Sequence, residues 1–340
     1  MVLLRLAFAV LRLLAWPWLW LRARRAAAPS TWLKLTVDGG ATDLPPRRRV
    51  WQRFGAPSLS LHGLAEAVDT VLAAPGVEGL VVTVRALRMG MASAASLRAQ
   101  LARLTAAGRT VLVHLPDGAG MKELFVASAG TRLLLGPRTS VTALGFSVRA
   151  RYLRGLLDKV AVEPEVYAQG RFKSAGETLA RDSMSDAQRA QTDALLGTLY
   201  DVATRAIAEG RRLALPEVVA FVDAGPHGAK DAVAGRIADG VAYDDEVVPP
   251  TVKPRPLGAF HAARRAPRLP PLRRAPQVAV VEVHGPIVQR RGPGFGRMAV
   301  EGEILGAIRA ARRAPRVKAV VLHIDSPGGS ALASDRMHHE

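Results

Sequence analysis

The fold is decided by a stretch of sequence that occurs twice. Residues 64–84 read LAEAVDTVLAAPGVEGLVVTV, and residues 304–324 read ILGAIRAARRAPRVKAVVLHI. Each stretch begins with apolar residues at helical spacing, passes through a proline-marked turn, and ends in a continuous apolar run. Such a run is typical of a strand that is buried on both faces of a parallel sheet. The sequence therefore predicts two copies of one α/β unit, offset by 240 residues.

The chain after the first copy continues in the same alternation. We expect helices at residues 93–107, 119–129 and 150–160, and strands at residues 110–115, 132–135 and 165–168. A capping box at Ser185 predicts a long helix that ends near Gly210. Alternating strands and helices indicate an α/β fold in which crossover helices cover a layered sheet.

Proline divides the chain into domains. Residues 249–276 contain eight prolines and seven basic residues but no acidic residue. Proline at this density interrupts helices and inner strands, so we interpret the stretch as a Pro/Arg-rich linker, with a lipid-facing or partner-facing patch as the alternative. The linker separates a first α/β domain, residues 61–248, from the start of a second, residues 277–340. Residues 26–60 are expected to connect the first domain to the N-terminal segment.

The N-terminal residues 1–25 are predicted to associate with a membrane. Residues 2–21 are apolar over about the length of a membrane span, interrupted by Arg5 and Arg12. Three tryptophans lie at the far end of this run and three arginines follow it, a combination typical of a bilayer interface. An amphipathic helix lying in the interface, a short span and an uncleaved signal anchor all fit this pattern, and a buried helix is the weaker alternative.

The net charge of +18 suggests a nucleic-acid function, but its location argues against one. Thirteen of these charges lie in residues 1–34 and 249–276, and aromatic residues make up only 5% of the chain, so a base-stacking surface is not expected. Cysteine is absent, which excludes disulfides and thiolate metal sites. The eight histidines are scattered and form no H-x-x-x-H pattern, so we expect no metal site.

Two turns carry residues suited to chemistry. Residues 325–330 (DSPGGS) follow the predicted strand 319–324, and their glycines would let backbone N–H groups converge on an anion or oxyanion. An ordinary tight turn fits the same residues equally well. Lys173 lies in residues 170–175 (GRFKSA) and would act as a base if apolar surroundings lowered its pKa. A lysine near a helix N-terminus is more often a surface residue.

Three segments that include these turns resemble a known family. LLDKVAVEPEVYAQ (156–169), GRFKSAGETLARDSMSDAQRAQ (170–191) and AVVLHIDSPGGSALASD (319–335) are similar to segments of bacterial signal peptide peptidases of the SppA type. The resemblance implies an internally duplicated Clp protease/crotonase-like fold. It also implies a membrane-bound serine endopeptidase that degrades remnant signal peptides with a Ser–Lys dyad, without metal or cofactor. It assigns Lys173 as the general base, and Gly328 and Gly329 to the loop that holds the oxyanion or substrate.

The resemblance places the nucleophilic serine in a Ser-Gly-Gly turn after the next strand. The matching turn of the first copy, residues 117–120 (DGAG), has no serine, and the repeat offset puts the counterpart in the second copy at about residue 360, beyond Glu340. The second copy is therefore expected to be incomplete. A chain without the nucleophile would also suit a catalytically inactive, membrane-anchored binding or scaffold protein, and a crotonase-like acyl-CoA enzyme is a weaker third hypothesis.

The resemblance also implies partners and a location. The expected partners are peptide substrates, membrane lipid and further copies of the chain in a homo-oligomer, whereas nucleic acid is not expected. The expected location is the cell (inner) membrane, with the catalytic domain on its outer or periplasmic face.

Overall fold

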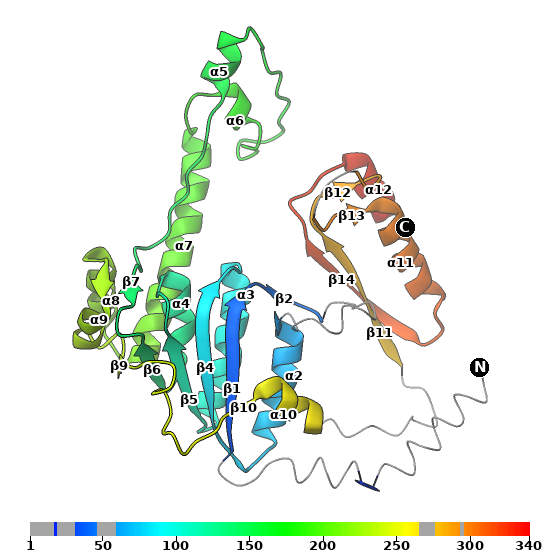
Figure 1. Ribbon diagram of the computed structural model, residues 1–340. Helices are drawn as coiled ribbons and strands as arrows, with labels where there is room; N and C mark the ends of the chain where they lie inside the picture. The colour runs from blue at the N-terminus through cyan, green and yellow to red at the C-terminus, as the bar shows by residue number, and fades with distance from the viewer. Residues whose placement is uncertain (1–16, 19–30, 46–58, 265–275, 293–295) are drawn as a thin grey trace. The chain divides into compact units, whose positions relative to one another are not determined.

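The computed structural model describes residues 17–18, 31–45, 59–264, 276–292 and 296–340 (Figure 1). The chain divides into two compact units, one within residues 18–266 and one that includes residues 267–340. The predicted membrane-associating segment 1–25 lies outside the described residues, apart from Pro17 and Trp18. Within the described part of the chain, no helix combines the length and the apolar character needed to cross a bilayer.

A six-stranded parallel sheet forms the centre of the larger unit, with the strand order β10-β1-β4-β5-β6-β9. Its strands are β1 (Thr31–Gly39), β4 (Val77–Leu87), β5 (Thr110–Leu115), β6 (Arg132–Leu135), β9 (Gly240–Val241) and β10 (Arg255–Pro256). The longer helices of this unit are α2 (Leu61–Leu72), α3 (Met91–Ala106), α7 (Asp186–Arg211), α8 (Leu215–Asp223) and α10 (Leu257–Arg264), and α4 (Met121–Ala127) and α9 (Ala229–Ala234) are shorter. The predicted α/β fold with a parallel sheet is therefore confirmed.

Apolar periodicity explains how the helices cover this sheet. In α3, the side chains of Leu97, Leu101 and Leu104 are fully buried, and their spacing of three to four residues puts them on one helix face. β4 lies inside the sheet between β1 and β5, and it is buried along most of its length because apolar clusters pack on both of its faces. The other face of the sheet has a smaller apolar cluster, in which Val247 packs with residues of three strands.

Two segments are more ordered than their composition suggests. Residues 26–60, expected only to connect, supply β1, whose Leu33 and Val37 belong to the core, as well as β2 (Ala41–Thr42) and β3 (Leu59–Ser60). Residues 249–276, expected to be an extended linker, supply β10 and α10. The prolines flank the stretch 257–264 but do not interrupt it, so a helix forms there and buries Leu257 and Phe260.

Residues between β7 (Ser140–Val141) and α7 form an arm beside the sheet domain. The arm contains the short helices α5 (Arg154–Lys159) and α6 (Glu177–Ala180), which lie at the end of α7 that is far from the sheet (Figure 1). The predicted helix after Ser185 is confirmed, since the Ser185 hydroxyl accepts a hydrogen bond from the Gln188 N–H at 3.1 Å. The predicted strand 165–168 is wrong: no described strand pairs with this segment, and Tyr167 is 91% exposed.

The second unit repeats the local plan of the first. β11 (Gln277–His284) pairs in parallel with β14 (Val317–Asp325), and β12 (Ile287–Val288) pairs in parallel with β13 (Ala299–Val300). The helix α11 (Glu301–Arg313) precedes β14, as α2 precedes β4, and α12 (Ala331–His339) follows it. The expectation that β14 is buried on both faces is wrong, because most of its residues are exposed and none is buried.

Asp239 ties the end of α7 to the start of β6. Arg211 donates to its Oδ1 at 2.6 Å, and the Leu133 N–H donates to its Oδ2 at 2.7 Å. Burial acts to raise the pKa of Asp239, but these hydrogen bonds outweigh burial and hold the pKa below its usual value. The carboxylate therefore contributes stability above the pKa it has in the unfolded chain, and this stability is lost as the pH falls through the folded-state pKa.

We expect Asp239→Asn to destabilise the protein at pH 7 by about 1 kcal/mol, a value kept low because the carboxylate is partly exposed. Denaturant unfolding between pH 7 and pH 2 should show the difference from the wild type shrinking below about pH 4. Asp245→Asn, which changes an exposed carboxylate of the same unit, is the matched control. A constant difference across this pH range would contradict the assignment.

Candidate active site

Lys173 lies in an exposed turn of the arm, between α5 and α6. Its N–H donates to the Gly170 carbonyl at 3.2 Å, and Gly170 has a φ of +90°, a conformation that favours glycine. The Lys173 side chain is exposed, and so is the neighbouring ring of Phe172. The apolar burial expected around a basic lysine is therefore not supplied by this turn.

Apolar side chains are exposed along much of the same arm. Those around Lys173 include Val166, Tyr167, Phe172 and Leu179, and each is at least 41% exposed. Large contiguous patches of exposed apolar residues are rare on protein surfaces, and where they occur they often mark interaction sites. Lys173 therefore lies in a segment of the arm with several exposed apolar side chains.

The glycine turn after β14 has a geometry that only glycine tolerates. The Ile287 N–H donates to the Gly328 carbonyl, and the Ser330 N–H donates to the Ile287 carbonyl, both at 2.9 Å. Gly328 and Gly329 have φ values of +98° and +155°, and a Cβ at position 329 would overlap with the backbone of Ile287. Because its two neighbours make the hydrogen bonds to Ile287, the Gly329 N–H faces away from that residue. An amide so directed is suited to donating to a carbonyl oxygen or oxyanion.

The three serines near this turn have local structural roles. Ser326 accepts from the Gly328 N–H at 3.1 Å, and Ser330 caps α12 by accepting from the Ala333 N–H at 3.2 Å. The Ser334 hydroxyl donates to the Ser330 carbonyl at 3.0 Å. These hydrogen bonds account for the serines without a nucleophilic role.

Residues 117–120 form the turn of the larger unit that matches the expected Ser-Gly-Gly turn, and a carboxylate of the same unit already binds its backbone. The turn follows β5, and the helix α4 begins directly after Gly120. The Glu123 carboxylate accepts from the Gly120 N–H at 3.2 Å and from the Leu87 N–H at 3.1 Å. The amides at the ends of β4 and of this turn are thus satisfied internally, in keeping with the missing serine.

Lys173 belongs to the larger unit, whereas Gly328 and Gly329 belong to the second unit. Neither unit alone unites the three residues that the family resemblance assigns to the site. The second unit also contains a group that sequence reasoning missed, formed by Glu282, His284 and His323. The two histidines are 39 residues apart, so only the register of β11 against β14 shows that they are neighbours.

Comparison with known proteins supports the resemblance. Residues 104–253, which include Lys173, match the family described as peptidase family S49. The chain is 26% identical to "Serine protease SPPA, chloroplastic" of Arabidopsis thaliana, over 96% of its own length and 48% of the relative's. It is 27% identical to "Protease 4" of Salmonella typhi and 26% identical to "Protease 4" of Haemophilus influenzae, over 64% and 69% of its length.

The chain spans about half, or less, of the length of the curated relatives it matches. The resemblance to SppA-type proteins is confirmed by these matches. They do not test the roles of Lys173, Gly328 and Gly329, which stay predictions.

Proposed function

We propose that this chain is an S49-type protein and part of a membrane-associated serine endopeptidase that degrades remnant signal peptides by a Ser–Lys dyad. The observation that carries this proposal is the family match over residues 104–253, which includes the GRFKSA segment and Lys173. The names of the relatives, a serine protease and two proteases, support the same class of reaction.

In the proposed reaction, the neutral Lys173 amine takes the proton of a serine hydroxyl. The serine oxygen attacks a peptide carbonyl, and backbone N–H groups, including that of Gly329, stabilise the oxyanion. The protonated lysine then gives its proton to the leaving amine, and water hydrolyses the acyl-enzyme. The nucleophile is the serine of a Ser-Gly-Gly turn at about residue 360, one repeat offset after residues 117–120.

A lysine that acts as a base at neutral pH must be shielded from water, since desolvation disfavours its charged form. Lys173 is exposed in its own unit, so its shielding must come from a further surface. The exposed apolar side chains of the arm support a homo-oligomer in which a neighbouring copy covers this surface. The shared strand order and parallel pairings of the two units support two copies of one α/β unit within the chain.

Membrane association rests on the N-terminal residues 1–25, whose apolar run, tryptophans and arginines suit a bilayer interface. The partners proposed with it are hydrophobic peptides and membrane lipid. The proposed location is the inner membrane, with the catalytic domain on the periplasmic face.

The test uses the protein produced from its complete reading frame, reconstituted in lipid vesicles. We expect it to hydrolyse a fluorogenic peptide with a signal-peptide sequence. A serine-directed phosphonate probe should label a serine in a Ser-Gly-Gly turn, identified by mass spectrometry, and should not label Ser326, Ser330 or Ser334. A folded protein that neither cleaves the peptide nor reacts with the probe would contradict the proposal and favour the inactive binding protein.

A further inference from the structure

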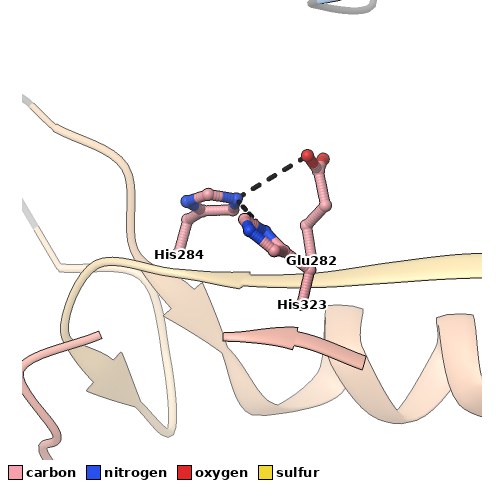
Figure 2. A group of neighbouring side chains, drawn as sticks. All are labelled: Glu282, His284 and His323. Carbon is pink, nitrogen blue, oxygen red and sulfur yellow. Dashed lines mark hydrogen bonds and ion pairs between the residues drawn. The ribbon is translucent and has the colours of Figure 1, made fainter. Parts of the chain in front are cut away.

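A group of polar side chains lies on one face of the β11–β14 pair. The strand register aligns Glu282 with His323, and His284 with Asp325. Val281 and Val283 alternate with Glu282 and His284 and are buried in a cluster with Ile304 of α11. Because successive strand residues point to opposite faces, the polar group lies on the face away from α11. Figure 2 shows Glu282, His284 and His323 projecting from the same side of the strands.

The ligand atoms of this group are spaced for one metal ion. The His323 Nδ1 lies 3.2 Å from the His284 Nε2, which lies 3.6 Å from the Glu282 Oε1, as Figure 2 shows with dashed lines. All three residues offer ligand atoms within 4.8 Å of one another. Bonds of about 2.0–2.1 Å in a tetrahedral zinc site put neighbouring ligand atoms about 3.3 Å apart. The distances of 3.2 Å and 3.6 Å lie on either side of this value, so the side chains would need to move little to bind an ion.

Asp325 supplies a feature typical of metal-bound histidine. Its Oδ2 lies 3.5 Å from the His284 Nδ1, on the side of the ring opposite to Nε2. A carboxylate that accepts the Nδ1–H leaves the lone pair on Nε2, where it faces His323 and Glu282, and makes that nitrogen a better ligand.

We propose that Glu282, His284 and His323 bind a divalent first-row transition metal ion of the Zn²⁺ type, with Asp325 orienting His284. Two imidazoles and one carboxylate suit zinc and its neighbours rather than calcium or magnesium, which prefer oxygen ligands throughout. The ion would join β11 to β14 directly before the glycine turn at residues 326–330. This inference does not rest on the proposed peptidase activity.

The site is tested by titrating the purified full chain with Zn²⁺ in a calorimeter, and with Co²⁺ followed by visible absorption. We expect one ion per chain and an intense Co²⁺ spectrum typical of low coordination number. His323→Ala and Glu282→Gln should each weaken binding at least about 10-fold, and Asp325→Asn should weaken it about 10- to 100-fold.

The matched control is the double variant His338→Ala/His339→Ala, which removes an adjacent histidine pair at the end of α12 and should leave binding unchanged. Circular dichroism of each variant confirms folding, and Glu282→Gln keeps the size of the side chain, so it still tests the site if a histidine variant unfolds. Absence of binding at 100-fold excess metal, affinity unaffected by Glu282→Gln and His323→Ala, or binding lost in the control would each overturn the proposal.

Discussion

Lys173→Ala is expected to abolish peptide hydrolysis while the protein stays folded. A general base contributes about 10²–10⁴ in rate, and members of a catalytic unit lose activity together, so we expect a loss of at least about 10³-fold in kcat/KM. Folding should be unaffected, because the Lys173 side chain is exposed and the turn is held by a backbone hydrogen bond. The measurement is hydrolysis of a fluorogenic peptide by the protein from its complete reading frame.

The matched control is Lys159→Ala, which removes another lysine of the same arm, at the end of α5. It should keep near wild-type activity. Lys173→Arg separates charge from base function, because arginine keeps the positive charge but cannot lose its proton at neutral pH. This variant should be as inactive as Lys173→Ala. Activity within about 10-fold of the wild type in either Lys173 variant would remove the lysine from the mechanism.

Gly210→Ala is expected to destabilise the protein strongly. A Cβ at position 210 would overlap with the carbonyl oxygen of Ser128, which caps the C-terminus of α4. Ser128 is itself buried, and its hydroxyl donates to the carbonyls of Phe125 and Ala206. Since the obstacle is backbone rather than a flexible side chain, α7 must shift, at a cost of about 2–3 kcal/mol.

Gly197→Ala provides the control within the same helix. Nothing lies within 4 Å of a Cβ at position 197, and alanine is a better helix former than glycine, so this change should stabilise the protein by about 0.5–1 kcal/mol. Chemical denaturation of both variants gives the comparison. Equal effects of the two substitutions would show that α7 does not approach α4 as closely as described.

Local patterns predicted the parts of the fold that depend on neighbours in sequence. The strands 110–115 and 132–135 have the predicted bounds, and Ser185 caps the predicted helix. Such features follow from apolar periodicity and capping, which act over a few residues. Predictions failed where a strand depends on pairing with a segment distant in sequence. Residues 165–168 contain β-forming side chains but pair with no described strand. The segment that forms β1 was not predicted as a strand, and it becomes one by pairing with β4.

The candidate site likewise has parts that short motifs predict and parts that depend on distant contacts. The GRFKSA and DSPGGS turns stand out in the sequence because each is a short contiguous motif. The grouping of Glu282 with His323 depends on the register of two strands, which spacing along the chain does not reveal. The hydrogen bond from the Leu87 N–H to the Glu123 carboxylate likewise depends on the packing of α4 against the end of β4.

The unpaired side of β14 affects how this chain behaves in concentrated solution. Its backbone groups on that side have no strand partner among the described residues, and Val320, Leu322 and Ile324 are each at least half exposed. An open strand with apolar side chains is a template on which the same strand of another molecule can add by hydrogen bonding. No proline interrupts β14, and Lys318 is its only basic residue apart from His323, so little in the strand opposes such growth. Colloidal stability of the isolated chain therefore depends on keeping this edge covered.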